Sequence, residues 1–291
     1  MVIQLLQQKN ECKKNIIVVL LCAGEGLRLK EITSKIPKSL IKIKCLDELS
    51  ILEHTILNLI KLGIERIYII TGHLGDKIKK FITSFKKTNR DFEEKLFVID
   101  SEGQYKRGPL YSLLSITKNK NFFKKKCVYV VMPGDTIFQL ELLTHIITFL
   151  LNNFKTFQEN PAMFYRRISV NALKTIQISE MISTADIEKK HHQYVLKKIR
   201  KQDLKTLSDS DYVRQVVPIS IFPYNFLISL LEHVKHVQVK TISQIINNMI
   251  TRDYNVIAVK ISNEHQFFDI DTKSDLNNFL GFNKNKKEGK G

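Results

Sequence analysis

The sequence predicts an α/β protein with a three-layer architecture, in which helices cover both faces of an open, mostly parallel sheet. Residues 16–22 and 127–132 are almost wholly apolar, as expected for strands that are buried on both faces of a parallel sheet. Between these two runs, shorter strand-like segments alternate with amphipathic helical patterns, the order from which parallel sheets are built. A glycine-bearing loop directly follows the first run, at the edge where such sheets bind ligands.

The first half of the chain contains clear signals for individual elements. Ser50 and Glu53 form a capping-box pattern, and apolar residues then recur at helical spacing. Residues 67–70 predict a second strand, which an amphipathic helix follows. Residues 96–99 predict a third strand, and Gly108 with Pro109 predicts a turn that opens a helix whose N-terminus could receive a nucleotide.

The second half changes in pattern. Residues 163–167 and 215–222 predict strands, and residues 181–201 predict a hairpin with His191 and His192 at its tip. Thr241 and Gln244 form a second capping-box pattern before an amphipathic helix that runs to residue 250. Residues 256–261 predict a further strand, after which Asp269 and Asp271 precede a closing helix.

Length and composition agree with one large or two small globular domains. We place a single domain at residues 15–282. The 291 residues are 43% hydrophobic. Residues 1–14 are expected to form an N-terminal extension, and the polar, charged residues 283–291 a disordered basic tail. The net charge of +17 is compatible with nucleic acid, an anionic membrane or small polyphosphates. Because lysines occur along the whole chain, abundant solvated lysine is the simplest explanation.

The four cysteines show no C-x-x-C spacing, and Cys22 and Cys127 lie in or beside apolar strands. Reduced thiols and a cytoplasmic location follow most simply. No apolar run approaches the roughly 18 residues of a membrane span. The N-terminal residues 1–14 are broken by glutamines and offer no small-residue cleavage site, so we do not expect a secretory signal.

The loop after residue 22 has the features of a phosphate site. Gly24 and Gly26 let the backbone approach a ligand and turn its N–H groups inward, while Arg28 and Lys38 add positive charge. We interpret the loop as a triphosphate site. The competing explanation is a tight turn that needs glycine for its geometry alone.

Two commoner glycine-loop motifs do not fit these residues. A dinucleotide fold requires a third glycine after GEG and an acidic residue after the next strand, but position 29 is leucine and that strand runs into Gly72. A P-loop requires a Lys-Ser or Lys-Thr pair directly after its second glycine, and none follows here.

Residues 21–40, LCAGEGLRLKEITSKIPKSL, resemble the signature of the nucleoside-triphosphate transferase family, commonly written L-x-A-G-x-G-x-R-L followed by P-K-x-L. The matching residues are Leu21, Ala23, Gly24, Gly26, Arg28, Leu29, Pro37, Lys38 and Leu40. The resemblance implies a Rossmann-like, GT-A-type nucleotidyltransferase fold. It also implies nucleotide binding by Leu21, Ala23, Gly24, Glu25, Gly26, Arg28, Lys38, Gly72, Gly108 and Pro109.

Three aspartates are candidates for metal binding. Asp135 follows a central apolar strand, where such folds bind ligands, although a turn aspartate would look the same. Asp269 and Asp271 alternate on an extended segment, so both project to one face and offer oxygen ligands to a hard cation. In the family that the chain resembles, matching carboxylates bind Mg²⁺. We prefer Asp269 over Asp271 as the second ligand.

The resemblance implies transfer of a nucleoside monophosphate from a triphosphate to a phosphorylated small molecule, with release of pyrophosphate. Arg28 and Lys38 would hold the phosphates, and Asp135 would hold Mg²⁺. Tyr111-Ser112-Leu113 and the FFDIDT string are similar to inositol-phosphate and phosphocholine cytidylyltransferases, which slightly favours CTP over UTP, dTTP or GTP. The acceptor stays open among sugar 1-phosphates, inositol phosphate and phosphocholine-like molecules, with residues 156–224 as a β-rich, acceptor-side lid.

Two other classes of function compete with this one. A GT-A-type glycosyltransferase would use an Asp-x-Asp motif in mid-chain, whereas Asp135 is followed by Thr136 and Ile137, and the Asp-x-Asp pair comes late. A non-catalytic module could bind RNA or another polyanion through the positive charge. We expect no nucleic-acid partner, because the aromatic residues are not interleaved with a basic stripe.

Overall fold

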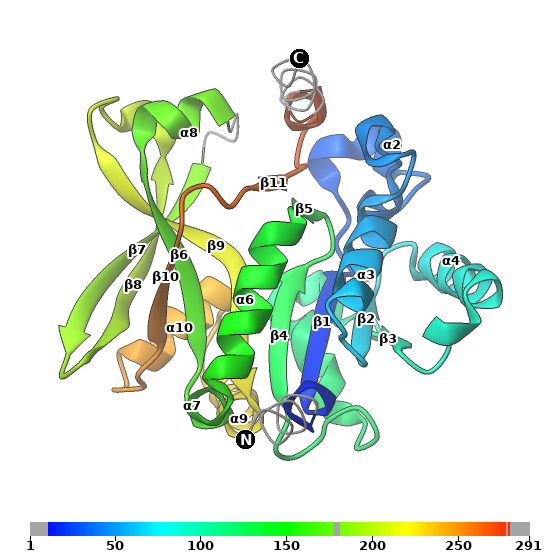
Figure 1. Cartoon of the computed structure of the whole chain (residues 1–291), viewed down its shortest axis with the longest axis horizontal. Helices are drawn as coiled ribbons and strands as arrows, with labels where there is room; N and C mark the ends of the chain where they lie inside the picture. Colours follow the sequence, from blue (N-terminus) through cyan, green and yellow to red (C-terminus); the bar gives the residue numbers. More distant parts are fainter. Residues whose placement is uncertain (1–10, 177–180, 278, 280–291) are drawn as a thin grey trace, which may run out of the picture.

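The computed structural model describes residues 11–176, 181–277 and 279. Residues 1–10 of the predicted N-terminal extension and the whole predicted tail, residues 283–291, lie outside the described residues. Within these ranges, helices and strands form a mixed α/β fold around one large sheet (Figure 1).

The large sheet has nine strands in the order β3-β2-β1-β4-β9-β6-β10-β8-β7 within the described residues. Their bounds are β1 Ile16–Cys22, β2 Ile67–Thr71, β3 Leu96–Asp100, β4 Val128–Pro133, β6 Ala162–Ser169, β7 Met181–Lys190, β8 Gln193–Asp203, β9 Tyr212–Pro223 and β10 Ile257–Ile261. Two short strands, β5 (Thr136–Phe138) and β11 (Phe267–Asp269), pair antiparallel beside it.

The expectation of a mostly parallel sheet holds for one half only. β3, β2, β1 and β4 are parallel neighbours, but β9 runs antiparallel to both β4 and β6. β10 is parallel to β6, whereas β8 and β7 are again antiparallel. The sheet is therefore mixed. Parallel neighbours require a long crossover connection, usually a helix, whereas antiparallel neighbours do not. Between β6 and β9 the chain forms the β7–β8 hairpin, and β9 then returns antiparallel to β6.

Helices pack on both faces of the sheet. Side chains of α3, α4, α6 and α7 join one hydrophobic cluster, and those of α5, α9 and α10 join the cluster on the other face. In Figure 1, α3 and α6 lie in front of the sheet. The α-helices whose bounds lie wholly within the described residues are α2 Lys30–Thr33, α3 Ile51–Lys61, α4 Gly75–Thr88, α5 Pro109–Leu114, α6 Leu140–Asn152, α7 Phe154–Glu159, α8 Val170–Ile176, α9 Tyr224–His233 and α10 Ile242–Ile250. Residues 11–14 and 273–277 are also helical.

Short 3₁₀ helices fill several connections, at Leu27–Leu29, Lys38–Leu40, Lys44–Leu46, Arg90–Phe92, Gln104–Arg107, Ser115–Lys118 and Leu204–Thr206. Among the residues described, none of the helices has both the length and the apolar character needed to cross a membrane.

Both predicted capping boxes are present. Ser50 Oγ accepts from the Glu53 N–H at 3.2 Å at the start of α3, and Thr241 Oγ1 accepts from the Gln244 N–H at 3.2 Å at the start of α10. The predicted hairpin is also confirmed, because a turn at His191 and His192 joins β7 to β8.

The segment predicted as an acceptor-side lid, residues 156–224, contributes strands to the large sheet. β6 and β9 are inner strands of the sheet, and the β7–β8 hairpin and α8 extend to its far edge (Figure 1). Side chains from this segment can therefore reach the ligand edge of the sheet.

Replacement of the buried cap of α3 should destabilise the protein. Ser50 is 3% exposed, so Ser50→Ala leaves the Glu53 N–H without an acceptor in a place that water scarcely reaches. We expect a loss of about 1–2 kcal/mol in the free energy of unfolding, measured by urea denaturation. Thr241→Ala, at an exposed cap, is the matched control and should cost less. A larger loss for Thr241→Ala would contradict this account.

Candidate functional site

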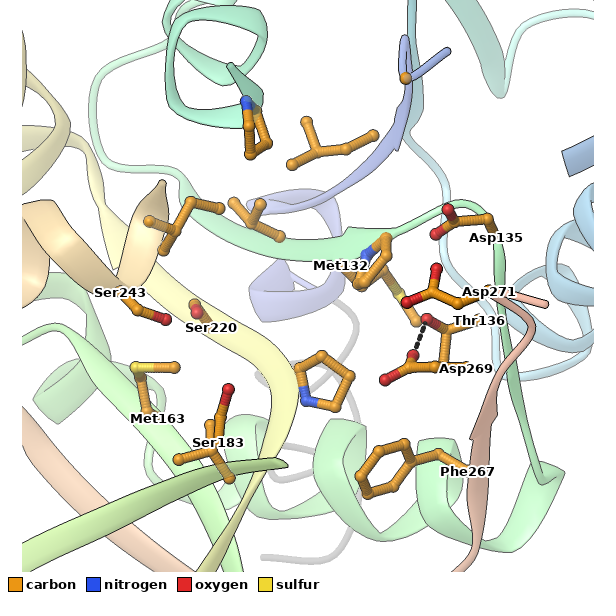
Figure 2. A pocket seen from close by; sticks show the side chains of 18 of the residues that line it. Met132, Asp135, Thr136, Met163, Ser183, Ser220, Ser243, Phe267, Asp269 and Asp271 are labelled. Carbon is orange, nitrogen blue, oxygen red and sulfur yellow. Dashed lines mark hydrogen bonds between the residues drawn. The ribbon is translucent and has the colours of Figure 1, made fainter. Parts of the chain in front are cut away.

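A cavity of about 500 Å³ opens at the carboxyl ends of β1 and β4. It lies where the parallel half of the sheet meets the mixed half, and it adjoins a second pocket of about 440 Å³. Tyr105, Asp135 and Asp271 line both. Figure 2 shows the two ends of the main cavity, with Asp135, Thr136, Asp269 and Asp271 at one end and Met163, Ser183, Ser220 and Ser243 at the other.

The loop after β1 forms one wall of these two cavities. A Cβ atom on Gly24 would have no atom within 4 Å, so the space beside its backbone is open toward the main cavity. Gly26 has a φ of +61°, a conformation that favours glycine, and its carbonyl accepts from Thr33 Oγ1 at 2.8 Å. The loop therefore combines a fixed turn with room for a ligand.

Lys38 lies at the centre of an ion cluster between the two cavities. Its Nζ is 2.8 Å from Asp135 Oδ2 and 2.5 Å from Asp271 Oδ1, and its side chain is 8% exposed. Arg28, which is 68% exposed, completes the cluster with its Nη1 2.9 Å from Asp271 Oδ2. Burial alone would lower the pKa of Lys38, but the two carboxylates more than offset it and raise that pKa.

Asp271 is held ionised by the same contacts. Burial opposes its ionisation, yet Lys38 and Arg28 together lower its pKa. The structure thus brings together four residues that the sequence analysis assigned to the site: Arg28, Lys38, Asp135 and Asp271.

Asp269 has a different environment. Pairing of β11 with β5 places it opposite Thr136, whose Oγ1 donates to Asp269 Oδ1 at 2.5 Å. Burial raises the pKa of Asp269 to about 6, and the negative charges of Asp135 and Asp271 add to the shift. Among the described residues, no Lys, Arg or His lies within ion-pair distance of its carboxylate. Among the described residues it is therefore a carboxylate with no direct ion-pair partner, although the charge of Lys38 acts on it from a distance.

A hard divalent cation fits this donor set. Asp269 and Asp135 are neighbouring oxygen donors whose mutual repulsion a cation would relieve. Asp135 shares Lys38 with Asp271, and Asp271 has Arg28 as a second cationic partner. In the part of the chain that is described, no three His, Cys, Asp or Glu side chains form a complete metal cage. Mg²⁺ suits such a site, because it keeps several waters and takes further ligands from substrate phosphates.

The remaining sequence-predicted residues divide between the two cavities. Leu21, Ala23, Gly24 and Pro109 line the main cavity. Glu25, Gly26, Arg28, Lys38 and Gly108 line the adjoining pocket.

Two residues of the predicted nucleotide site have other neighbours in the structure. Gly72 lines neither cavity: a Cβ there would lie 2.5 Å from the Tyr105 ring, so glycine makes room for Tyr105 rather than for a ligand. The start of α5 is partly closed, because the Leu110 N–H donates to the Lys240 carbonyl at 3.2 Å. Gly108 (φ +119°) permits this close approach, and the start of α5 is correspondingly less available to a nucleotide.

Sequence reasoning missed the residues of the far wall. They lie on β7, β8, β9 and α10 and have no common spacing in the sequence; we call them the acceptor wall, defined as Ser183, Lys201, Gln215, Ser220 and Ser243. The alternation of apolar and polar residues could have predicted the strands β8 and β9. It could not have predicted which of their side chains line the same cavity. Lys201 also contributes to the lowered pKa of Asp271, after Lys38 and Arg28, which puts its charge near the ion cluster.

Comparisons with known proteins agree with the resemblance found in the sequence. Residues 17–157 match the family model described as nucleotidyl transferase, which confirms that resemblance. The chain is 32% identical over 121 residues to the bifunctional protein GlmU of Methanococcus maripaludis (strain C5), a match that covers 42% of this chain and 25% of that protein. The chain thus spans about a quarter of the length of the curated relatives it matches.

Solved structures show the same fold at low sequence identity. The inositol-1-phosphate CTP transferase from T. maritima has a TM-score of 0.62 at 15% identity, over 94% of this chain and 95% of that one. A UDP-glucose pyrophosphorylase from Acinetobacter baumanii has a TM-score of 0.61 at 15% identity, over 89% and 90% of the two chains. The expected GT-A-like α/β fold is therefore confirmed.

The environments of Asp269 and Asp271 predict opposite effects of neutralisation on stability. Because the folded pKa of Asp269, about 6, exceeds the ordinary 3.8, its charge costs stability above pH 6, and this cost declines as the pH falls toward 4. Asp269→Asn should therefore stabilise the metal-free protein at pH 8 by about 1–3 kcal/mol, and by less at pH 4.5. Asn still accepts from Thr136. Urea denaturation at both pH values measures the change.

Asp271→Asn is the matched control. Its folded pKa is lowered, so the charged form stabilises the fold at pH 8, and the variant should be less stable there than wild type. Equal destabilisation by both substitutions at pH 8 would refute the assigned environments.

Proposed function

We propose that this chain, whose residues 17–157 match the nucleotidyl transferase family, transfers a nucleoside monophosphate from a nucleoside triphosphate to a phosphorylated small molecule. Pyrophosphate is the second product. The observation that carries the proposal is the nearly buried Lys38, held between Asp135 and Asp271 where the glycine loop meets the cavity. Such a cation, beside a backbone open to a ligand, suits a reaction between two phosphates.

The chain's own residues act by charge and position. An oxygen of the acceptor phosphate attacks the α-phosphorus in line, and the bond from that phosphorus to the β-phosphate oxygen breaks. The acceptor oxygen is already an anion at neutral pH, so no general base is required. Arg28 and Lys38 exchange carboxylate partners for phosphate oxygens, Arg28 toward the β- and γ-phosphates and Lys38 toward the α-phosphate.

Asp135 and Asp269 would hold Mg²⁺ with Thr136 orienting the Asp269 carboxylate. When bound, Mg²⁺ supplies positive charge that stabilises the phosphates during transfer. Asp271 keeps Lys38 and Arg28 on the same side of the cavity until the triphosphate arrives.

The acceptor wall indicates the class of acceptor. Lys201 offers a cation for the acceptor phosphate, and the serine hydroxyls and the Gln215 amide offer hydrogen bonds to hydroxyl groups. Outside the aspartate cluster, the described lining has no carboxylate, and Phe267 and Tyr105 are its aromatic side chains. A quaternary ammonium needs an aromatic cage or a carboxylate. A sugar 1-phosphate or inositol phosphate therefore fits better than phosphocholine.

We propose CTP as the first nucleotide to test, followed by UTP, dTTP and GTP. Tyr105, Pro109 and Ser112 line the cavity on the side of the glycine loop and are candidates for contact with the base. A cytoplasmic location is part of the proposal, because thiols such as the buried Cys22 and Cys127 remain reduced there.

Pyrophosphate release tests the reaction. The assay combines Mg²⁺, each nucleoside triphosphate in turn and a pool of sugar 1-phosphates, inositol phosphate and phosphocholine. Release that requires both acceptor and metal supports the proposal, and division of the pool identifies the acceptor. If the protein instead consumes a nucleotide sugar without pyrophosphate release, a glycosyltransferase replaces the proposed function.

Removal of either central charge should abolish most turnover. Lys38→Ala and Asp135→Ala are each expected to lower kcat by about a hundredfold or more, the loss found for one preorganised electrostatic group. Lys42→Ala, at an exposed position in the same segment, is the control and should stay near wild type. Turnover within a few-fold of wild type in both site variants would refute the assigned roles.

Lys201→Ala should weaken acceptor binding selectively. Loss of one charged hydrogen bond is expected to raise the KM for the acceptor about tenfold, while the KM for the triphosphate stays within threefold. Lys197, exposed on the same strand and not part of the cavity lining, provides the matched control as Lys197→Ala. An unchanged acceptor KM in Lys201→Ala would remove Lys201 from the proposed acceptor wall.

A further inference from the structure

We propose that Arg166, in the middle of β6, is a positioning residue that holds the acceptor wall and the strand bearing Asp269 in a fixed relation to each other. The inference rests on the proposed nucleotidyl transfer for its catalytic meaning. Its structural basis is independent of that function and can be tested without substrate.

Arg166 occupies a position where the strand pattern calls for an apolar residue. Phe164 and Ile168, two residues away on either side and on the same face of β6, are buried hydrophobic side chains. Arg166 is 1% exposed, and among the described residues no carboxylate forms an ion pair with it. Burial lowers its pKa to about 10. A buried charge without a counterion costs several kcal/mol, so its presence requires an explanation.

Uncharged oxygen acceptors surround the guanidinium instead. Its Nε donates to Gln215 Oε1 at 2.8 Å, and its Nη1 donates to the His265 carbonyl at 2.8 Å and to Gln266 Oε1 at 3.0 Å. The guanidinium carbon also lies 4.9 Å from the centre of the Phe267 ring. One side chain therefore reaches two parts of the site that are distant in the sequence.

The contact with Gln215 fixes part of the acceptor wall. Gln215 lies directly opposite Arg166 in the β6–β9 register and lines the cavity. Because its carbonyl oxygen accepts from Arg166, the amide plane and the direction of its NH₂ group are set.

The contacts with residues 265–267 fix the other part. β11 has only three residues and pairs on one side with β5, which carries Thr136. Arg166 supports the segment that enters β11 and packs on Phe267, two residues before Asp269. The position of the Asp269 carboxylate thus depends on Arg166 as well as on Thr136.

Arginine is suited to this task in a way that lysine is not. Its planar fork donates in several fixed directions at once, whereas the lysine ammonium is a point charge on a flexible stem. Arg166→Lys therefore keeps the positive charge but removes the planar group that donates hydrogen bonds in several fixed directions. Arg167→Lys is the matched control, because Arg167 is the next residue on the same strand and is exposed.

Hydrogen–deuterium exchange of the ligand-free protein provides the first test. In Arg166→Lys, the amides of residues 265–269 should exchange at least about tenfold faster than in wild type, since one side of the segment is released. Arg167→Lys should match wild type. If these amides exchange in Arg166→Lys as slowly as in wild type, the inference is overturned, because a positive charge alone would then be sufficient to hold the segment.

Steady-state kinetics tests the catalytic consequence. With the substrates that wild type turns over, Arg166→Lys should lower kcat and raise the acceptor KM, each by about tenfold or more, with the triphosphate KM within threefold. A lower melting temperature with unchanged kcat and acceptor KM would show a merely structural role and overturn the inference.

If Arg166→Lys does not fold, Gln266→Leu replaces it in both tests. Gln266 does not line the cavity, and its loss removes one of the anchors of β11. Faster exchange at residues 267–269 with lower kcat and unchanged acceptor KM supports the inference, and wild-type behaviour overturns it. If wild type turns over no substrate pair, the proposed function fails, whereas the exchange result still decides the positioning role.

Discussion

The site depends on a lysine that is kept charged while almost fully removed from water. Lys38 alone would pay a large desolvation cost, and Asp135 and Asp271 offset that cost by direct contact. These three residues come from the segment after the glycine loop, the end of β4 and the segment after β11. Much of the fold can be understood as the means of bringing them together, since parallel strands end at one edge and β11 returns to it.

The sequence predicted well what depends on local chemistry. Both capping boxes, the strands of the parallel half and the β7–β8 hairpin were evident from side-chain pattern alone. Long-range consequences were not predicted: the antiparallel direction of β9 follows from the path of the chain, which no residue pattern records. Two local elements, α6 and α9, were also missed. The packing of Tyr105 against Gly72 could not be predicted either, because sequence alone does not show which side chain lies against a glycine.

The residues of the candidate site likewise divide into those that local sequence predicted and those that it did not. Arg28, Lys38, Asp135 and Asp269 were identified because a motif or an alternation marked them. The acceptor wall and Arg166 were missed, because each of these residues gains its meaning from a partner on another strand. At position 166 the alternation of β6 predicts a buried hydrophobic residue, not an arginine. The charged residue at an apolar position of the strand pattern was the available signal. Its role can be interpreted only once the hydrogen-bond partners of Arg166 are known.

The large sequence separation between Asp269 and Asp271 and their partners in the site affects the order in which the site is synthesised. Lys38 and Asp271 are 233 positions apart in the chain, and Thr136 and Asp269 are 133 apart. A ribosome therefore completes β1 to β4 and the glycine loop long before β11 and the segment after it, which supply Asp269 and Asp271. During that interval Lys38 has Asp135 as its partner from this cluster, and Arg28 has none. Until β11 and the segment after it have been synthesised, the nascent chain carries the glycine loop, Arg28 and Lys38 without Asp269 and Asp271, so the complete ion cluster forms only after that point.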